Sequence, residues 1–380
     1  MPHKVLILGS AHPLRGGGIA TFNERLARAF MENGDTVMIA SFSLQYPSFL
    51  FPGKTQYSDE APPQDLHIKS WLNSINPFNW FFTAIKIRKW QPDLVVVRYW
   101  LPFMGPSLGT VCRLVKKGRK TKIVAVVDNA IPHEKRPGDR IFTRWFVKSV
   151  DAFITMSQQV MQDLEIFDKK RPRLYTYHPL YDNFGALLSK AEACKKLNLD
   201  PSQNYYLFFG FIRDYKGLDM LLEAIATDDI KKIDFKLIIA GEYYANASFY
   251  EKLIEKLKVA DKLIKHTRFI SNDDVKYYFS AADLIIQPYK NATQSGVTQI
   301  AYHFEKPILT THVGGLAEIV LDGQTGIIVD AHKDAVAKGI KRFYLDNNKS
   351  KYAENIKKEK TKYTWDNFIK KIYKVLSKES

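Results

Sequence analysis

Short apolar segments alternate along the chain with longer segments whose apolar residues recur every three or four positions. The short segments are bounded by glycine, aspartate or proline, as buried strands are, and the longer ones have the period of amphipathic helices. Regular alternation of the two is typical of parallel βαβ units whose sheet is covered on both faces. The pattern therefore predicts an α/β protein.

The first half of the chain contains one series of such elements. Its predicted strands are Lys4–Gly9, Thr36–Ser41, Leu94–Arg98, Lys122–Val127 and Ala152–Met156. Its predicted helices are Ile19–Asn33, Asn79–Trp90, Gly105–Lys117 and Ile141–Ser149. Together they predict a doubly wound domain.

The second half contains a similar series. Its predicted strands are Tyr205–Phe209, Lys236–Ala240, Leu284–Pro288, Ile308–Thr311 and Gly326–Val329. Its predicted helices are Leu218–Ala226, Tyr250–Lys258, Ser271–Ser280, Thr298–Phe304 and Lys333–Leu345. A second doubly wound domain follows from this series.

The boundary between the two domains is predicted near residue 180. Residues 171–182 contain Pro172 and Pro179 and have no helical period, so we interpret them as the interdomain connection. The domains are then residues 1–180 and 181–362. Residues 363–380 have one apolar helical face, which we expect to pack back on the first domain. Two such domains side by side leave a cleft at the carboxyl ends of their strands, where ligands bind.

Composition narrows the choice of partners. Lysine and arginine number 56 against 40 acidic residues, which gives a formal net charge of +16. This excess favours phosphate esters, anionic lipid or nucleic acid. The two cysteines, Cys112 and Cys194, are far apart and predict neither a disulfide framework nor a thiolate zinc site. No segment approaches the ~20 apolar residues that cross a bilayer, and no export signal is predicted.

Three consecutive glycines, Gly16, Gly17 and Gly18, lie between the first predicted strand and the first predicted helix. Their backbone N–H groups are unobstructed and precede the positive end of a helix, so they could hold a phosphate or a sugar oxygen. Because the spacing is not G-x-G-x-x-G, the pattern does not indicate a dinucleotide site. A flexible turn without a ligand is the alternative.

A basic segment follows the first strand of the second half. Gly210 begins it, and Arg213 and Lys216 come next, at the mouth of the expected cleft. Arginine, with its planar fork, and lysine, as a point charge, could together clamp a diphosphate. Two solvated basic residues on a loop are the alternative interpretation.

Two further segments join strands to helices in the second half. Residues 287–299 contain Gln294, Ser295, Gly296 and Val297, whose hydroxyl and backbone donors suit an oxygen-rich ligand. Residues 306–320 contain Gly314, Gly315 and then Glu318 at a predicted helix start. Glu318 could cap that helix or bind a ligand hydroxyl, and geometry favours the cap.

The order of these segments resembles the retaining GT-B glycosyltransferases of family 4, and the resemblance covers nearly the whole chain. It rests most on Arg213 with Lys216 and on the glycine pair followed by Glu318. The resemblance implies two Rossmann-like domains that face a central cleft, a nucleotide-diphosphate sugar held mostly by the second domain and an acceptor held by the first. It also implies retention of anomeric configuration, no obligatory metal and no cofactor. Arg213 and Lys216 would neutralise the leaving diphosphate.

The sequence departs from the family's pattern ahead of Lys306-Pro307. Members usually carry two glutamates there, which contact the donor sugar and the ribose, but Ala292 and Ile300 occupy those positions. The donor contacts are therefore predicted to be amide and hydroxyl hydrogen bonds. A relative that has kept the cleft and lost catalysis also fits this departure.

Asp128 and His133 follow the fourth predicted strand, where relatives often place a histidine and an asparagine beside the reacting sugar. A carboxylate accepts protons and an imidazole titrates near neutrality, so either residue could orient the acceptor hydroxyl. A turn in which Asp128 bonds its own backbone is an equal alternative. In the second half, residues 268–270, beginning with Arg268, resemble the segment whose backbone meets the nucleotide base, and a core strand is the alternative there.

Basic and aromatic residues interleave in residues 79–90 and again in residues 98–120. Such stretches can lie on anionic lipid, and an ordinary helix with a solvated basic face is the alternative. No nucleic-acid-binding module is recognisable in the sequence, and neither His178 nor His312 has a histidine or carboxylate partner at metal-ligand spacing. We expect a cytoplasmic protein that works there or at the inner face of the membrane.

The sequence thus predicts a retaining, metal-independent hexosyltransferase. It would move a sugar from a nucleotide-diphosphate sugar to a glycan or lipid-linked acceptor, in cell-surface polysaccharide or glycolipid synthesis. A nucleotide-sugar epimerase of GT-B architecture and a non-catalytic nucleotide-sugar-binding relative are the alternatives.

Overall fold

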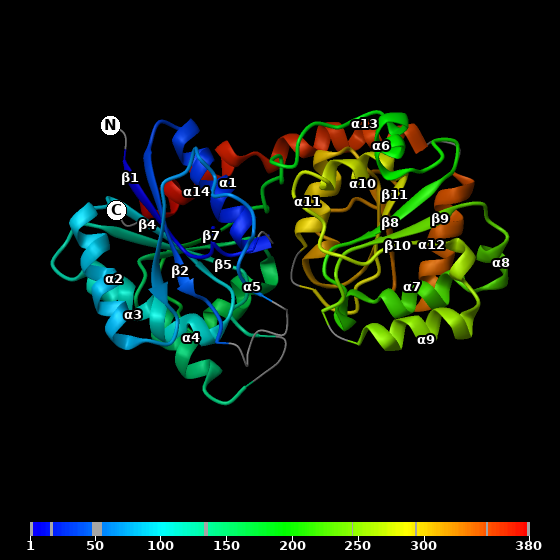
Figure 1. Cartoon of the computed structure of the whole chain (residues 1–380). Helices are drawn as coiled ribbons and strands as arrows, with labels where there is room; N and C mark the ends of the chain where they lie inside the picture. Colours follow the sequence, from blue (N-terminus) through cyan, green and yellow to red (C-terminus); the bar gives the residue numbers. More distant parts are fainter. Residues whose placement is uncertain are drawn as a thin grey trace. The chain divides into compact units, whose positions relative to one another are not determined.

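The chain forms two compact units in a computed structural model. One comprises residues 1–179 and 364–380, and the other comprises residues 180–363. The structure describes residues 3–15, 18–47, 55–132, 136–244, 246–292, 295–346 and 349–377. Each unit contains a parallel sheet with helices on both faces (Figure 1).

The sheet of the first unit has seven parallel strands in the order β3-β2-β1-β4-β5-β6-β7. Its strands are β1 Lys4–Leu8, β2 Thr36–Leu44, β3 Ile68–Asn73, β4 Leu94–Tyr99, β5 Lys122–Val127, β6 Ala152–Thr155 and β7 Arg173–Tyr175. The central strands are almost wholly buried because both faces are covered by helices. The order reverses between β1 and β4.

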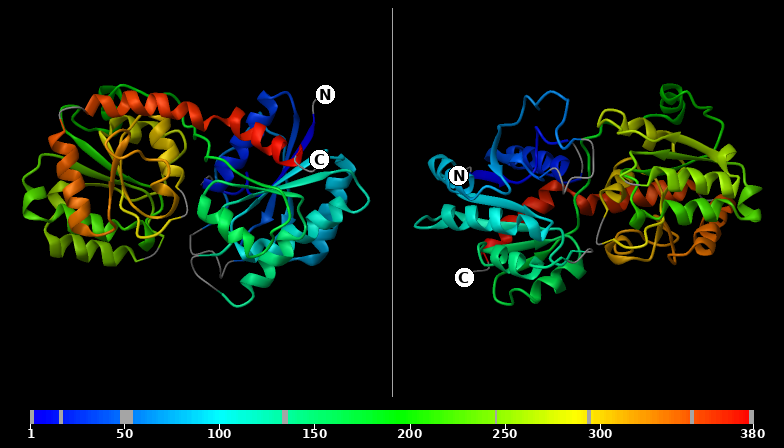
Figure 2. Two further views of the ribbon diagram at one scale, coloured as in Figure 1. Left: turned by 180° about the vertical axis from the view of Figure 1, so that it is seen from behind. Right: turned by 60° about the horizontal axis from the view of Figure 1, so that its bottom comes forward.

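Within the described residues of this unit, six helices cover the sheet. They are α1 Gly18–Glu32, α2 Pro77–Trp90, α3 Gly105–Lys116, α4 Asp139–Val147, α5 Gln158–Glu165 and α14 Trp365–Ser377. The helices α2, α3 and α4 lie side by side, whereas the carboxyl-terminal α14 lies beside α1 (Figures 1 and 2). The two groups of helices lie on opposite faces of the sheet because the crossovers are right-handed. The connection from β1 to β2 through α1 runs in one direction along the sheet, and the connections through α3 and α4 run in the other.

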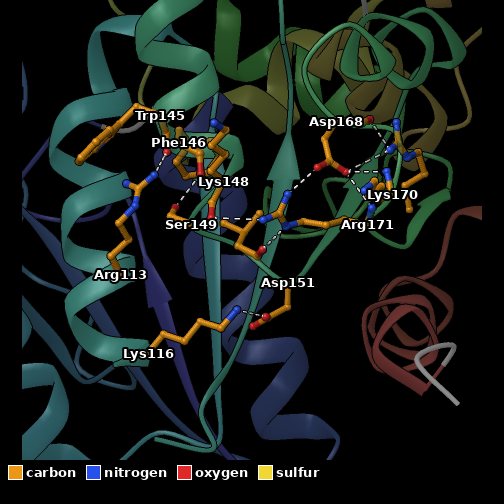
Figure 3. Close-up of polar contacts among 12 residues, drawn as sticks. Arg113, Lys116, Trp145, Phe146, Lys148, Ser149, Asp151, Asp168, Lys170 and Arg171 are labelled. Atoms are coloured by element: carbon orange, nitrogen blue, oxygen red, sulfur yellow. Dashed lines mark hydrogen bonds and ion pairs between the residues drawn. The ribbon is translucent and has the colours of Figure 1, made fainter. Parts of the chain in front are cut away.

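A polar network ties α3, α4 and the chain before β6 together at the amino edge of the sheet (Figure 3). Lys116 pairs with Asp151, which also accepts the backbone N–H of Ile123 at 2.8 Å. Arg171 donates to the carbonyls of Val150 and Lys148 and pairs with Asp168. The network holds the ends of these helices on the sheet.

The sheet of the second unit has six parallel strands in the order β10-β9-β8-β11-β12-β13. Its strands are β8 Tyr205–Phe209, β9 Lys236–Ala240, β10 Leu263–His266, β11 Leu284–Gln287, β12 Ile308–Thr311 and β13 Gly326–Val329. The helices are α6 Lys190–Leu197, α7 Leu218–Ile225, α8 Asp228–Lys231, α9 Ala247–Leu257, α10 Val275–Ala281, α11 Gly296–His303, α12 Lys333–Leu345 and α13 Lys349–Glu359. The helices α7, α9 and α12 pack together, and α6 packs with α10 (Figure 1).

The predicted strands and helices are confirmed, with ends that differ by a few residues. Three strands were not predicted, and all three are edge strands: β3, β7 and β10. Their residues are mostly half-buried or exposed, so they lack a continuous apolar run. Because β7 lies within residues 171–182, the prediction that this stretch is only a connection is wrong for its first half.

Candidate functional site

The site is expected where the strand order of a doubly wound sheet reverses, because ligands bind there at the carboxyl ends of the strands. In the second unit this point lies between β8 and β11. The loop after β8 contains residues 210–217, and the loop after β11 begins at Pro288. Both loops therefore border the same point of the sheet.

Two glycines shape the loop after β8. Gly210 has a φ of +94°, and a Cβ atom there would lie 2.8 Å from Lys216 Nζ. Gly217 has a φ of +69°, and a Cβ atom there would lie 1.9 Å from the carbonyl oxygen of Pro288. A side chain would be strained by the backbone conformation at both places. At Gly217 it would also collide with the backbone of the loop after β11, and at Gly210 it would displace the ammonium of Lys216.

Lys216 is almost completely buried at this junction. Its Nζ donates to the carbonyl of Phe209 at 3.4 Å and lies 5.7 Å from the centre of the Tyr289 ring. Burial lowers the pKa of Lys216, and the charge of Arg213 acts in the same direction. Within the described residues Lys216 has no carboxylate partner. A bound anion would provide the missing charge.

Arg213 is the second cation of the loop. Its guanidinium stacks on the ring of Tyr244, with 3.6 Å between Cζ and the ring centre. None of the carboxylates in the part of the chain that the structure describes pairs with it. Its donors are therefore available to a ligand, and stacking holds the group in place.

The nearby carboxylates are occupied elsewhere. Lys290 pairs with Asp214 at 2.8 Å and with Asp219 at 2.7 Å. These hydrogen bonds raise the pKa of Lys290 although its partial burial lowers it. Lys290 neutralises one of the two carboxylate charges beside Arg213 and Lys216, so these three cations outnumber the two acids and the group stays positive by one charge.

The amino end of α11 completes this arrangement. Ser295 caps the helix by accepting the N–H of Val297 at 3.2 Å, and its hydroxyl also accepts from Gln287 Nε2 at 2.9 Å. Thr298 donates to Gln287 Oε1 at 2.9 Å. A Cβ atom on Gly210 would lie 4.0 Å from the Val297 side chain, so the positive end of the helix is next to the cationic loop. This arrangement suits a phosphate or diphosphate.

The structure thus brings together five residues of the predicted donor site, with Arg213 on the same loop as two of them. The five are Gly210, Lys216, Ser295, Gly296 and Val297.

Arg268 is exposed and follows the edge strand β10, so the alternative of a core strand at 268–270 is wrong. Glu318 is also exposed. The predicted helix start is a single 3-10 turn, Gly314–Leu316, without a side-chain cap, so in the described part of the chain Glu318 does not cap a helix that begins there. Gln294 lies outside the described residues.

The acceptor-side predictions fall in the first unit. Gly18 is the first residue of α1, whereas Gly16, Gly17 and His133 lie outside the described residues. Asp128 follows β5 and is buried. Both of its oxygens accept from Arg98, at 2.6 and 2.7 Å. This ion pair was not predicted, and a contact between Asp128 and an acceptor stays a prediction.

Arg98 links Asp128 to a buried aromatic group. Its guanidinium lies 3.7 Å from the centre of the Phe22 ring, which meets His178 edge to face. Burial lowers the pKa of His178 to about 3, and the positive charge of Arg98 contributes. His178 is therefore neutral near pH 7, and its Nδ1–H donates to the carbonyl of Pro179.

A pocket also opens at the opposite, amino edge of the first sheet. Its walls include His3, Arg88, Asp93, Lys122 and Tyr373. Since it lies at the amino ends of β1, β4 and β5, we assign neither donor nor acceptor to it. Among the described residues, no three histidine, cysteine, aspartate or glutamate side chains come close enough together to hold a metal ion.

Comparison with known proteins gives the family. The model "Glycosyl transferases group 1" matches residues 189–363, and the model "Glycosyltransferase Family 4" matches residues 16–182. The chain belongs to the group 1 glycosyltransferases. Its two Rossmann-like sheets are those of the GT-B class, as the resemblance implied.

The chain is 25% identical over 273 residues to a D-inositol 3-phosphate glycosyltransferase of Streptomyces avermitilis. This match covers 67% of the chain and 58% of the relative. The fold is similar to that of Anabaena HepE, which was solved in complex with UDP and glucose. The TM-score is 0.72 at 14% sequence identity, and the match covers 99% of this chain and 100% of HepE. WaaG, a glycosyltransferase involved in lipopolysaccharide biosynthesis, gives a TM-score of 0.70 at 17% identity over 97% and 99% of the chains.

Sequence reasoning did not identify Tyr244, and it gave Gln287, Lys290 and Thr298 no role of their own although they lie in the predicted segment 287–299. Tyr244, Gln287 and Lys290 all follow or end strands at the carboxyl edge of the sheet, which is the signal that could have identified them. Thr298 carried no such signal, because its bond to Gln287 depends on how α11 packs against β11.

Proposed function

We propose that this glycosyltransferase moves a hexose, with retention of anomeric configuration, from a nucleotide-diphosphate sugar to a glycan or lipid-linked acceptor. The observation that carries the proposal is the buried, acid-free ammonium of Lys216 beside the amino end of α11. A buried charge without an opposite charge beside it is costly, and a diphosphate would offset that cost. In a nucleotide-diphosphate sugar, the bond that breaks joins the sugar to the diphosphate. A cation that binds the diphosphate therefore lies at the reaction centre.

The chemistry assigned to this site is stabilisation of the leaving group. As the glycosidic bond to the donor breaks, negative charge grows on the departing diphosphate. Fixed donors aimed at that charge lower the barrier. Lys216, Arg213 and the N–H groups at the start of α11 are such donors, and we propose that they make a divalent metal unnecessary.

The donor sugar is proposed to lie near the start of α11. Ala292 and Ile300, which replace the family's glutamates, are both buried and apolar. Contacts to the sugar and ribose would come instead from hydroxyl, amide and backbone groups around Ser295 and Gly296. The solved complex of HepE with UDP and glucose supports a sugar nucleotide as the donor.

The acceptor is proposed to bind the first unit at the carboxyl edge of its sheet, near the start of α1 and the strand end at Asp128. The lipopolysaccharide role of WaaG supports an acceptor of the cell surface, in polysaccharide or glycolipid synthesis. None of the helices in the described ranges is long and apolar enough to cross a membrane. We propose that the protein acts in the cytoplasm, at an anionic membrane surface.

A donor assay tests the function directly. The protein is incubated with UDP-, GDP- and ADP-hexoses without an acceptor, and the products are followed by NMR. A retaining transferase slowly releases free sugar that is first formed in the donor's anomeric configuration. An epimerase yields an altered sugar nucleotide, and a binding protein yields neither. Lys216→Ala should abolish sugar release, whereas Lys252→Ala, at an exposed lysine of α9, should leave it unchanged.

A further inference from the structure

Large apolar side chains are exposed on two helices of the first unit. Phe78, Phe81 and Phe82 on α2, and Ile141, Phe142 and Trp145 on α4, form what we term the α2/α4 face. Phe78 is 81% exposed, Ile141 70% and Phe82 58%. Single exposed apolar residues are normal, but grouped ones mark a binding surface.

The topology places these residues near one edge of the sheet. The helices α2 and α4 follow β3 and β5, which are parallel, so both helices begin at the carboxyl edge. Phe78, Ile141 and Phe142 lie in the first turns of their helices, and the other three residues lie in the second turns. The helix α3 lies between α2 and α4 and contacts both (Figure 1). The apolar groups therefore border the edge at which the acceptor is proposed to bind.

Basic residues accompany the apolar ones. Lys86 and Lys89 are exposed on α2, and Arg140, Arg144 and Lys148 are exposed on or just after α4. Asp139 is the single acidic residue in the sequences of α2, α3 and α4, and its carboxylate accepts the N–H of Arg136 at 2.7 Å. The face is thus apolar and strongly positive.

The exposed position of Trp145 is fixed by packing. A Cβ atom on Gly109 would lie 2.9 Å from the Trp145 ring, so α4 approaches α3 closely. Arg113 stacks on Trp145 at 3.9 Å and donates to its carbonyl (Figure 3). The Trp145 Nε1–H donates to Thr110 at 3.3 Å. A helix held in this way presents its outer side chains without rearrangement.

We propose that the α2/α4 face docks this protein on an anionic lipid bilayer. The aromatic and aliphatic side chains would enter the interface, and the lysines and arginines would contact lipid phosphates. Charge complementarity selects an anionic bilayer over a neutral one. Residues 98–120, predicted as a second lipid-binding stretch, have no exposed aromatic side chain, because Tyr99 and Trp100 are buried and Phe103 is half-buried. The proposal deepens the proposed function, since docking would bring lipid-linked acceptors to the carboxyl edge.

Vesicle sedimentation tests this proposal with the full chain. Wild-type protein is mixed with vesicles of phosphatidylcholine alone or with about one third phosphatidylglycerol, at low and high salt. We expect binding to the anionic vesicles, weakening as salt rises. Phe78→Ser with Phe82→Ser, and separately Ile141→Ser with Trp145→Ser, should each reduce the partition coefficient about tenfold or more. Lys86→Glu with Lys89→Glu should do the same.

The control is a double variant at two exposed apolar residues of the second unit, Phe249→Ser with Leu345→Ser, which should bind vesicles as the wild type does. Equal binding by all variants, or no binding to anionic vesicles at low salt, would overturn the proposal. Self-association that the face variants abolish, without any vesicle binding, would assign the face to a second copy instead. Acceptor-free sugar release should persist in every variant, so loss of docking is distinguishable from failure of the proposed function.

Discussion

Gly217 shows how strongly one residue constrains the cationic loop. It ends the 3-10 turn that contains Lys216 and begins α7, and its φ of +69° belongs to the left-handed region. The carbonyl of Pro288 lies where a side chain would begin. Backbone conformation and close approach therefore both require glycine, and both serve to place Lys216 against the loop after β11.

A matched pair of alanine variants separates these two requirements. Gly118 has nearly the same φ, +68°, but no heavy atom within 4 Å of the position of a Cβ atom. Gly118→Ala should cost about 1 kcal/mol, the strain of a left-handed alanine. Gly217→Ala adds a backbone collision and should cost about 3 kcal/mol or more. Urea unfolding of both variants measures this difference, and equal losses would show that the close approach is absent.

At this scale, sequence reasoning succeeds where residues share a strand end. Arg213 and Lys216 could be placed together because they follow β8 on one loop. The bonds from Lys290 to Asp214 and Asp219 cross 76 and 71 residues of sequence, and the pair of Arg98 and Asp128 crosses 30. Such pairs depend on which strands are neighbours. The apolar pattern shows where strands are but not their order in the sheet.

Among the elements, α14 joins distant parts of the chain. Phe22 of α1 meets Trp365 and Phe368 at ring distances of 4.9 and 5.6 Å. Tyr373 donates to Asp35 at 2.7 Å. The spacing of apolar residues in 363–380 predicted the helix and its buried face, because a helix of period 3.6 shows its contact side in sequence. The edge strands β3, β7 and β10 lack a continuous apolar run and were missed, whereas the edge strand β13 has one and was predicted.

Truncating the buried face of α14 should destabilise the first unit. Ile372 is fully buried, whereas Lys374 is exposed on the same helix. Ile372→Ala should lower the free energy of unfolding by about 2 to 5 kcal/mol, because it removes packed methyl groups and leaves a cavity. Lys374→Ala should change it by less than about 0.5 kcal/mol. Denaturant unfolding tests this prediction, and similar effects of the two variants would contradict the packing.

For the whole molecule, the two units divide the proposed work. The second contains buried positive charge at the reversal point of its sheet, and the first contains the α2/α4 face and the proposed acceptor edge. The net charge of +16 predicted anionic partners, but composition alone could not locate the charges. The structure assigns two groups of them, one around Lys216 and one along α2 and α4.

The central claim is that Lys216 binds the diphosphate of a sugar nucleotide. Its most direct test is calorimetric titration of wild type, Lys216→Met and the control Lys252→Ala with the nucleoside diphosphate and monophosphate of the preferred donor. Lys216→Met should weaken the binding free energy of the diphosphate by about 1.5 to 3 kcal/mol, the value of a hydrogen bond to a charged group. Its effect on the binding free energy of the monophosphate should be clearly smaller. The control should bind both as the wild type does. Unchanged diphosphate affinity in Lys216→Met would contradict the account.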